Sequence, residues 1–153
     1  MGIIFRIKNK KFKYSKAKKV LKICKKRKFP LVVADDPELA LSLGAYGTHL
    51  SKRVMYRRKY NKLKYSCSAH GLSDTRRVKN LKVDLTFISP LFKTTSSKLK
   101  KPLGLIFLGL VSVYISCNYG ALGGINIKNI RLLRSRNINT LGGLSYILEM
   151  LEK

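Results

Sequence analysis

Residues 31–50 read LVVADDPELALSLGAYGTHL, and this segment carries the clearest signals of the fold class. It begins with a short apolar run at residues 31–33 and ends with another at 47–50, and both runs predict β-strands. Between them Asp36 and Pro37 are typical of a helix start, because an acid caps the first turn and proline fits its first position. The spacing therefore predicts a strand–helix–strand unit whose two strands are parallel.

The same alternation extends over the rest of the chain. Further β-rich runs cover residues 3–7, 63–68, 85–89, 120–122 and 138–141. Helices are expected over residues 13–28, from Ser73 or Asp74 to Val78, over 127–133 behind an Asn126 cap, and from about Ser145 to the C-terminus, with a buried helix at 103–117. Strands that alternate with helices predict a parallel sheet, so the fold class is α/β.

About seven strands are visible, and this number limits the kind of α/β fold. A closed (β/α)₈ barrel needs eight strands, so we expect a TIM-barrel-type fold with about seven parallel strands that is shortened at its N-terminus. The first predicted strand starts at residue 3, which leaves no room for an earlier strand and helix. A gap, a filler helix or a partner's surface is expected at the open sheet edge. One domain over residues 1–153 is expected, because no change in composition marks a boundary.

The composition bears on ligands and location. The 153 residues include 33 Lys or Arg against 7 Asp or Glu, a net charge of +26. Such a charge attracts polyanions. However, the basic residues are spread out without a nucleic-acid motif, so solvated lysine faces are favoured over a dedicated site. The scattered Cys24, Cys67 and Cys117 indicate reduced thiols, and no apolar run reaches the roughly 18–20 residues of a membrane span, so a cytoplasmic protein is expected.

Six segments in a fixed order carry a family resemblance. They are IIFRIK (3–8), VVADDPELALSLGAYGTHLSK (32–52), YSCSAHGLSD (65–74), FISPLFKTTSSK (87–98), ALGGINIKNI (121–130) and INTLGGLSYI (138–147). Together they resemble thiamine phosphate synthase and its relative TenI, the thiazole tautomerase, beginning at that family's second strand. The resemblance implies a (β/α)₈ barrel without the first β/α unit. It also implies a transferase of thiamine biosynthesis that joins a hydroxymethylpyrimidine pyrophosphate to a thiazole phosphate, with Mg²⁺ assisting the release of pyrophosphate.

The first segment implies part of a pyrophosphate site. Arg6 and Lys8 match the family's pyrophosphate-binding arginine and lysine, whereas Ile4 replaces a glutamine. Alternation along a strand puts these three residues on one face, as the interior of a barrel requires. The alternative is that Arg6 and Lys8 are two more of the many basic surface residues.

The second segment implies a metal site. Asp35 matches the family's magnesium-binding aspartate, Ala34 replaces its pyrimidine-binding asparagine, and Val54 stands where the second magnesium-binding aspartate belongs. Mg²⁺ is usually held by one or two carboxylates plus substrate phosphates, so a weakened Mg²⁺ site is expected. Asp36 is explained more simply as a helix cap, and capping alone could account for both acids.

Two further strand ends carry polar matches. In GTHLSKRV (47–54) His49 is kept, whereas Ser51 and Lys52 replace a Gly-Gln pair; a histidine in this place is more often a core residue than a catalyst. Ser68 matches a serine near the pyrophosphate, although a strand-to-helix loop needs small polar residues in any case. No residue is assigned a catalytic role.

The last three segments imply the thiazole-phosphate site. The matching residues are Thr94, Ser96, Gly123, Gly124, Leu144 and Ser145, and Lys98 matches a loop lysine for the pyrophosphate. Hydroxyl groups, and N–H groups at glycine turns before helices, are good phosphate ligands. Glycine also serves plain tight turns, which is the alternative for Gly123 and Gly124.

Two main hypotheses of function follow from these matches. The first is the synthase. The second is a catalytically degenerate TenI- or synthase-like protein that binds a phosphate ligand without turnover, and Ala34 and Val54 favour it. Phosphorylated small molecules are the expected partners under both. Non-specific polyanion binding is a third hypothesis, and a homo-oligomer is one way to cover the open sheet edge.

Overall fold

The computed structural model describes residues 1–7, 13–51, 59–94, 101–134, 138 and 140–143. The chain forms two compact units, Met1–Cys67 and Ser68–Lys153. Seven strands lie in the described ranges, and the pairings within each unit are all parallel. The predicted α/β class with seven parallel strands is therefore confirmed.

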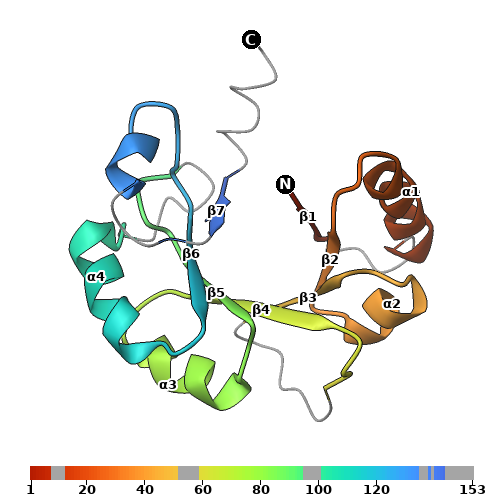
Figure 1. Ribbon diagram of the computed structural model, residues 1–153, viewed down its shortest axis with the longest axis horizontal. Helices are drawn as coiled ribbons and strands as arrows, with labels where there is room; N and C mark the ends of the chain where they lie inside the picture. The colour runs from red at the N-terminus through yellow and green to blue at the C-terminus, as the bar shows by residue number, and fades with distance from the viewer. Residues whose placement is uncertain (8–12, 52–58, 95–100, 135–137, 139, 144–153) are drawn as a thin grey trace. The chain divides into compact units, whose positions relative to one another are not determined.

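The first unit contains strands in chain order with helices between them. Its elements are β1 (Ile3–Phe5), α1 (Lys13–Lys26), β2 (Leu31–Ala34), α2 (Pro37–Ser42), β3 (Gly47–Leu50) and the start of β4 (Lys64–Ala69). β1 pairs with β2, β2 with β3 and β3 with β4. Figure 1 shows α1 and α2 on the same side of β2 and β3, and the helices bury Ala17, Cys24 and Ala40.

Local signals explain the short helix α2. The predicted cap is confirmed, because Asp36 Oδ1 accepts a hydrogen bond from Leu39 N at 2.9 Å and Pro37 occupies the first position. Asp36 Oδ2 also pairs with Lys13 Nζ at 2.9 Å. The helix ends where predicted, since Gly44 takes the left-handed φ of +60° that glycine adopts most readily.

The second unit continues the alternation. Its elements are α3 (Ser73–Leu81), β5 (Leu85–Ile88), α4 (Gly104–Tyr114), β6 (Asn118–Leu122), the 3₁₀ helix η3 (Ile130–Leu133) and β7 (Thr140–Gly142). β5 pairs with β6, and β6 with β7. Its buried core comes from both strands and helices, and includes Val78, Phe87, Ile88, Leu91, Leu108, Val111, Ala121 and Ile125.

Two predicted helix starts were wrong in detail. α3 has Leu72 as its N-cap with no side-chain cap bond, because Asp74 accepts a hydrogen bond from His70 N instead. Asn126 Oδ1 does accept from Asn129 N at 3.0 Å, but the helix that follows is only the 3₁₀ turn η3. The helix predicted from Ser145 onward lies outside the described residues.

The prediction of a buried helix at 103–117 was wrong for one face. α4 buries Leu108 and Val111, but the side chains of Ile106 and Val113 are 84% and 80% exposed. Uniform apolarity does not tell which face of a helix will pack, and a helix beside a sheet buries one face only. No helix in the described ranges is long and apolar enough to cross a membrane.

The burial of the cysteines gives a test of this fold. Cys24 and Cys67 are buried, whereas Cys117 is partly exposed, and burial raises the pKa of the Cys24 thiol. Because thiolates are the reactive form, we expect one thiol to react fast with a disulfide reagent near pH 8 in the native protein. Cys117→Ser should remove this fast phase. A fast phase that persists in Cys117→Ser would contradict the packing of α1 or β4.

Candidate functional site

Arg6 and Asp35, predicted for one site, lie together in the first unit. Each follows the last residue of its strand by one position, and β1 and β2 are parallel neighbours with Phe5 opposite Val33. Arg6 Nη1 lies 3.7 Å from Asp35 Oδ2, and the two side chains are 52% and 27% exposed. A cation and a carboxylate therefore share the carboxyl edge of the sheet and are open to solvent.

The backbone of Asp35 takes an unusual conformation. Its φ of +57° lies in the left-handed region, which few residues other than glycine adopt, although aspartate tolerates it better than most. Two hydrogen bonds hold it there, from Asp35 N to His49 O at 3.0 Å and from Ser51 N to Asp35 Oδ1 at 2.6 Å. Such strain concentrates at functional sites, and here it fixes the carboxylate with Oδ2 facing Arg6.

The donor set at Asp35 fits a weak Mg²⁺ site. Oδ1 is engaged by the N–H of Ser51, and Oδ2 faces Arg6 beyond hydrogen-bonding distance. Within the described ranges no three His, Cys, Asp or Glu side chains gather as metal ligands. Asp35 would thus be the residue at this strand end that holds Mg²⁺, an ion that proteins usually bind with one or two carboxylates together with substrate phosphates. Val54, the predicted lost ligand, lies outside the described residues.

The buried pair His49 and Ser66 supports a structural role for the histidine. His49 is 5% exposed, lies opposite Ser66 in the β3–β4 register, and has Nδ1 3.0 Å from Ser66 Oγ. In the β2–β3 register His49 is opposite Ala34, which is 5% exposed. The methyl side chain of Ala34 has no amide group for hydrogen bonding. The core interpretation of His49 is therefore favoured over catalysis.

Ser66→Ala is expected to lower the free energy of unfolding by about 1–3 kcal/mol, since the buried imidazole loses this partner. Urea unfolding measures the effect, with Ser42→Ala as the control, because the Ser42 hydroxyl bonds Leu39 O at an exposed position. A Ser66→Ala protein of unchanged stability but greatly reduced activity would instead make the pair part of the chemistry.

In the second unit the ends of β4 and β5 are tied together. Ser68, near the end of β4, is partly exposed, and its carbonyl accepts from Arg77 Nη2 at 2.6 Å. Ser89 N donates to Ala69 O at 3.0 Å, and the ring of His70 donates from Nδ1 to Ser89 O. The predicted pyrophosphate serine thus lies in a firmly held strand end.

The structure also brings together Thr94 and the two glycines. Leu91 N donates to Leu122 O at 2.9 Å and Phe92 N to Gly123 O at 3.0 Å, so the loop after β5 runs along the turn after β6. A Cβ on Gly124 would lie 2.4 Å from Lys93 O, the carbonyl just before Thr94. Gly123 and Gly124 have φ of +91° and +69°. Glycine is therefore needed for both backbone conformation and close approach.

Several predicted site residues lie outside the described residues and stay predictions. They are Lys8, Ser96, Lys98, Leu144 and Ser145. Two contacts of the structure were not predicted from the sequence. They are the hydrogen bond from Ser51 N to Asp35 and the ion pair of Asp74 with Arg77. No sequence signal marks Ser51, because a main-chain donor carries no residue preference.

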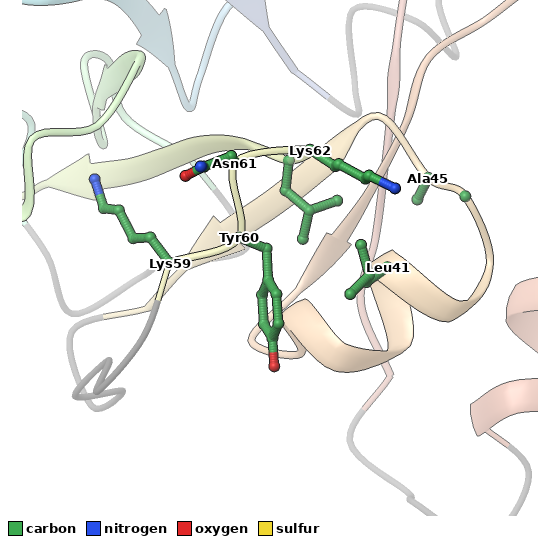
Figure 2. A pocket seen from close by; sticks show the side chains of 8 residues that line it. Leu41, Ala45, Lys59, Tyr60, Asn61 and Lys62 are labelled. Carbon is green, nitrogen blue, oxygen red and sulfur yellow. The ribbon is translucent and has the colours of Figure 1, made fainter.

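A pocket of about 770 Å³ lies away from all of these residues (Figure 2). Its lining consists of Leu41, Gly44, Ala45, Lys59, Tyr60, Asn61, Lys62 and Leu63. Ala45 and Leu63 precede β3 and β4, so the pocket lies at the amino ends of the strands, opposite the edge where such folds bind ligands. Figure 2 shows the amino groups of Lys59 and Lys62 pointing to opposite sides, so its charged groups do not converge on a ligand.

Comparison with known proteins agrees with the family resemblance of the sequence. The model of the TMP-TENI family, described as thiamine monophosphate synthase, matches residues 2–147. A putative thiamine-phosphate synthase 2 from Aquifex aeolicus is 30% identical over 140 residues, 89% of this chain and 75% of that protein. A thiamine-phosphate synthase from Herpetosiphon aurantiacus is 32% identical over 125 residues, 78% of this chain and 60% of that protein.

Solved structures support the same fold. A thiamine phosphate pyrophosphorylase from Pyrococcus furiosus has a TM-score of 0.79 at 21% identity, over 94% of this chain and 71% of that chain. One from Bacteroides thetaiotaomicron has a TM-score of 0.62 at 20% identity, over 94% and 68%. These likenesses confirm the predicted TIM-barrel-type α/β fold. With a family model that spans nearly the whole sequence, the chain belongs to the thiamine monophosphate synthase/TenI family.

Proposed function

We propose that the protein is a thiamine phosphate synthase, which joins a hydroxymethylpyrimidine pyrophosphate to a thiazole phosphate and releases pyrophosphate. The observation that carries the proposal is the pair formed by Arg6 and Asp35, 3.7 Å apart at adjacent strand ends, in a chain of the matching family. A leaving pyrophosphate needs cations around it and a carboxylate for its metal ion, and this pair supplies one of each.

The pyrophosphate residues of the proposal act on developing negative charge. As the bond from the pyrimidine methylene carbon to the pyrophosphate oxygen breaks, its electron pair leaves with the pyrophosphate, and the lone pair of the thiazole nitrogen forms the new bond to that carbon. Arg6 stabilises that charge, Ser68 donates a hydrogen bond, and Lys8 and Lys98 are proposed to add two more cations. Asp35 would hold Mg²⁺, which when bound offsets charge on the same group.

The thiazole-phosphate residues form the second half of the proposal. Thr94 lies beside the Gly123–Gly124 turn, where a hydroxyl and main-chain N–H groups are available to grip a phosphate. Ser96, Leu144 and Ser145 are proposed to complete this grip. Holding both substrates in fixed orientation supplies much of the acceleration in a reaction between two molecules.

A specific observation favours a second candidate, the phosphate-binding relative without turnover. Ala34 is buried beside His49 at the position where the family has its pyrimidine-binding asparagine. A methyl group there offers no hydrogen bond to a pyrimidine ring, and a site that leaves substrate polar groups unpaired loses affinity and rate. This candidate predicts phosphate binding with no product.

Paired binding titrations test the proposed division of the site. Arg6→Met should weaken binding of inorganic pyrophosphate roughly tenfold or more, because a charged contact contributes about 1.5–3 kcal/mol, and should leave thiazole phosphate affinity within about twofold. Thr94→Val should give the reverse pattern. If both variants weaken both ligands equally, the assignment of the two groups fails. Formation of thiamine phosphate then distinguishes the synthase from a phosphate-binding relative without turnover.

Three further properties belong to the same proposal. We propose a cytosolic location, supported by the odd number and scattered positions of the three cysteines, and a homo-oligomer that covers a sheet edge. The net charge of +26 is proposed to bind polyanions without sequence preference. Electrostatic binding of this kind falls steeply as salt rises, so titration with a random oligonucleotide at several salt concentrations checks it.

A further inference from the structure

Asp74 stands apart from the other acids in the part of the chain that the structure describes. It is 2% exposed, and it is the only acidic residue in those ranges that is buried. A buried carboxylate is costly unless it is paired and hydrogen-bonded. Asp74 lies in the first turn of α3, where the helix dipole favours a negative charge, but α3 has no side-chain cap bond. Its carboxylate therefore serves something other than capping.

The carboxylate of Asp74 acts on the end of β4. Oδ2 accepts from the backbone N–H of His70 at 2.8 Å, and Oδ1 lies 3.6 Å from Arg77 Nε. Arg77 in turn donates from Nη2 to the carbonyl of Ser68 at 2.6 Å. The ion pair thus holds the backbone on both sides of Ala69, which is fully buried.

Contacts with the residue after β5 complete the hold on this segment. Ser89 N donates to Ala69 O, and the His70 ring contacts Ser89 O through Nδ1. A carbonyl oxygen only accepts, so Nδ1 must carry the hydrogen, which fixes the orientation of the ring. Residues 68–70 are therefore held at Ser68 O, Ala69 O, His70 N and His70 Nδ1.

The geometry of Arg77 directs a hydrogen bond to Ser68 while the guanidinium stays in an ion pair with Asp74. Its Nε is buried and has no hydrogen-bond partner among the described residues, although Asp74 is close by. An arginine that served only to pair with a carboxylate would take the parallel two-bond geometry that this pair favours. Here the guanidinium is oriented differently, with Nη2 donating to the Ser68 carbonyl and Nε 3.6 Å from Asp74 Oδ1.

We infer that Asp74 and Arg77 are positioning residues for pyrophosphate binding, which hold the backbone of residues 68–70 in the conformation in which Ser68 receives this anion. The inference rests on the proposed function, because Ser68 is assigned to pyrophosphate there. Neither residue contacts the ligand in this scheme; both act through the backbone of residues 68–70. A misplacement of about 1 Å in a site of this kind costs up to about 10²-fold in rate.

Calorimetric titration of the full chain with inorganic pyrophosphate tests the inference. Arg77→Met and Asp74→Ala should each raise the Kd for pyrophosphate about tenfold or more and leave the Kd for thiazole phosphate within about twofold of wild type. The double variant should bind pyrophosphate about as well as the single variant with the lower affinity, since both substitutions release the same backbone segment, residues 68–70. In turnover, KM for the pyrimidine pyrophosphate should rise more than kcat falls.

Arg77→Lys separates positioning from charge and avoids the risk that a variant fails to fold. Lysine keeps the positive charge but lacks the planar fork that reaches Asp74 and Ser68 together, so positioning predicts the same loss as in Arg77→Met. Wild-type affinity in Arg77→Lys would overturn the inference. Lys13→Met is the matched control, because it breaks a different ion pair to an acid at a helix start, Lys13 with Asp36 at 2.9 Å, and should change pyrophosphate affinity less than twofold.

The outcomes also distinguish this inference from the proposed function. If the wild type binds pyrophosphate but forms no thiamine phosphate, the synthase proposal fails, and the titrations still decide the role of Asp74 and Arg77. If the wild type turns over and the Arg77 and Asp74 variants retain wild-type pyrophosphate affinity, the inference is wrong and the synthase stands. Melting temperatures of all variants show whether a loss of affinity only follows a loss of folding.

Discussion

Asp35→Asn is expected to lower kcat/KM for thiamine phosphate formation by about 10²–10³-fold, the usual cost of removing one preorganised charge-stabilising group. Asparagine tolerates the left-handed backbone of residue 35 and can still accept the Ser51 N–H, so the fold should persist. What is lost is the charge that faces Arg6 at 3.7 Å and would hold Mg²⁺. Initial rates over a range of Mg²⁺ concentrations measure the effect.

Asp36→Asn is the matched control for this experiment. The substitution removes the neighbouring carboxylate charge, but asparagine caps helices about as well as aspartate. The carboxylate of Asp36 is engaged by Leu39 N at the start of α2 and by Lys13 Nζ. Its activity and Mg²⁺ response should stay within about threefold of wild type, as for a surface change away from the site. Equal losses in the two variants would mean that Asp35 has no special role.

Gly124→Ala is expected to be the most destabilising single substitution in the proposed thiazole-phosphate site. The left-handed φ of +69° costs alanine about 1–2 kcal/mol. In addition, its Cβ would lie 2.4 Å from Lys93 O and 2.6 Å from Phe92 O, and main-chain atoms cannot yield as a flexible side chain can. We expect a total loss of about 3 kcal/mol, together with weaker thiazole-phosphate binding, because the loop that carries Thr94 must move.

Gly44→Ala isolates the part of this effect that comes from close approach. Gly44 has a similar φ of +60°, and a Cβ there would meet nothing within 4 Å, so only the backbone cost applies. Urea unfolding of both variants should therefore show the larger loss for Gly124→Ala. The same loss in both would contradict the packing of the loop after β5 against the Gly123–Gly124 turn.

Local signals explain why much of the fold could be predicted from the sequence. The signals of Asp36 and Pro37 act within one turn of helix, and the structure has both the predicted cap and the predicted helix start. The strand Gly47–Leu50 also has the predicted bounds. α4 shows where such signals end. Its residues are apolar on every face, so the pattern did not reveal that Ile106 and Val113 would be exposed.

The site was predictable where a family motif fixed residue identity, and not where geometry depends on distant chain segments. The motif indicated Arg6 and Asp35, which the fold brings together. It did not indicate the left-handed backbone of Asp35. Two hydrogen bonds hold that conformation, one from Asp35 N to His49 O and one from Ser51 N to Asp35 Oδ1. The pairing of Asp74 with Arg77 was also missed, because an acid in a first helical turn predicts a cap and gives no sign of burial.

Thiamine phosphate formation by the purified protein, supplied with both substrates in the presence and absence of Mg²⁺, is the decisive experiment for the synthase. We predict thiamine phosphate and pyrophosphate in equal amounts, only when Mg²⁺ is present, and with half-maximal rate at a high Mg²⁺ concentration, because Asp35 is the one carboxylate proposed to hold the ion. The absence of product at every Mg²⁺ concentration, despite saturable binding of thiazole phosphate, would contradict the synthase and leave a phosphate-binding member of the family.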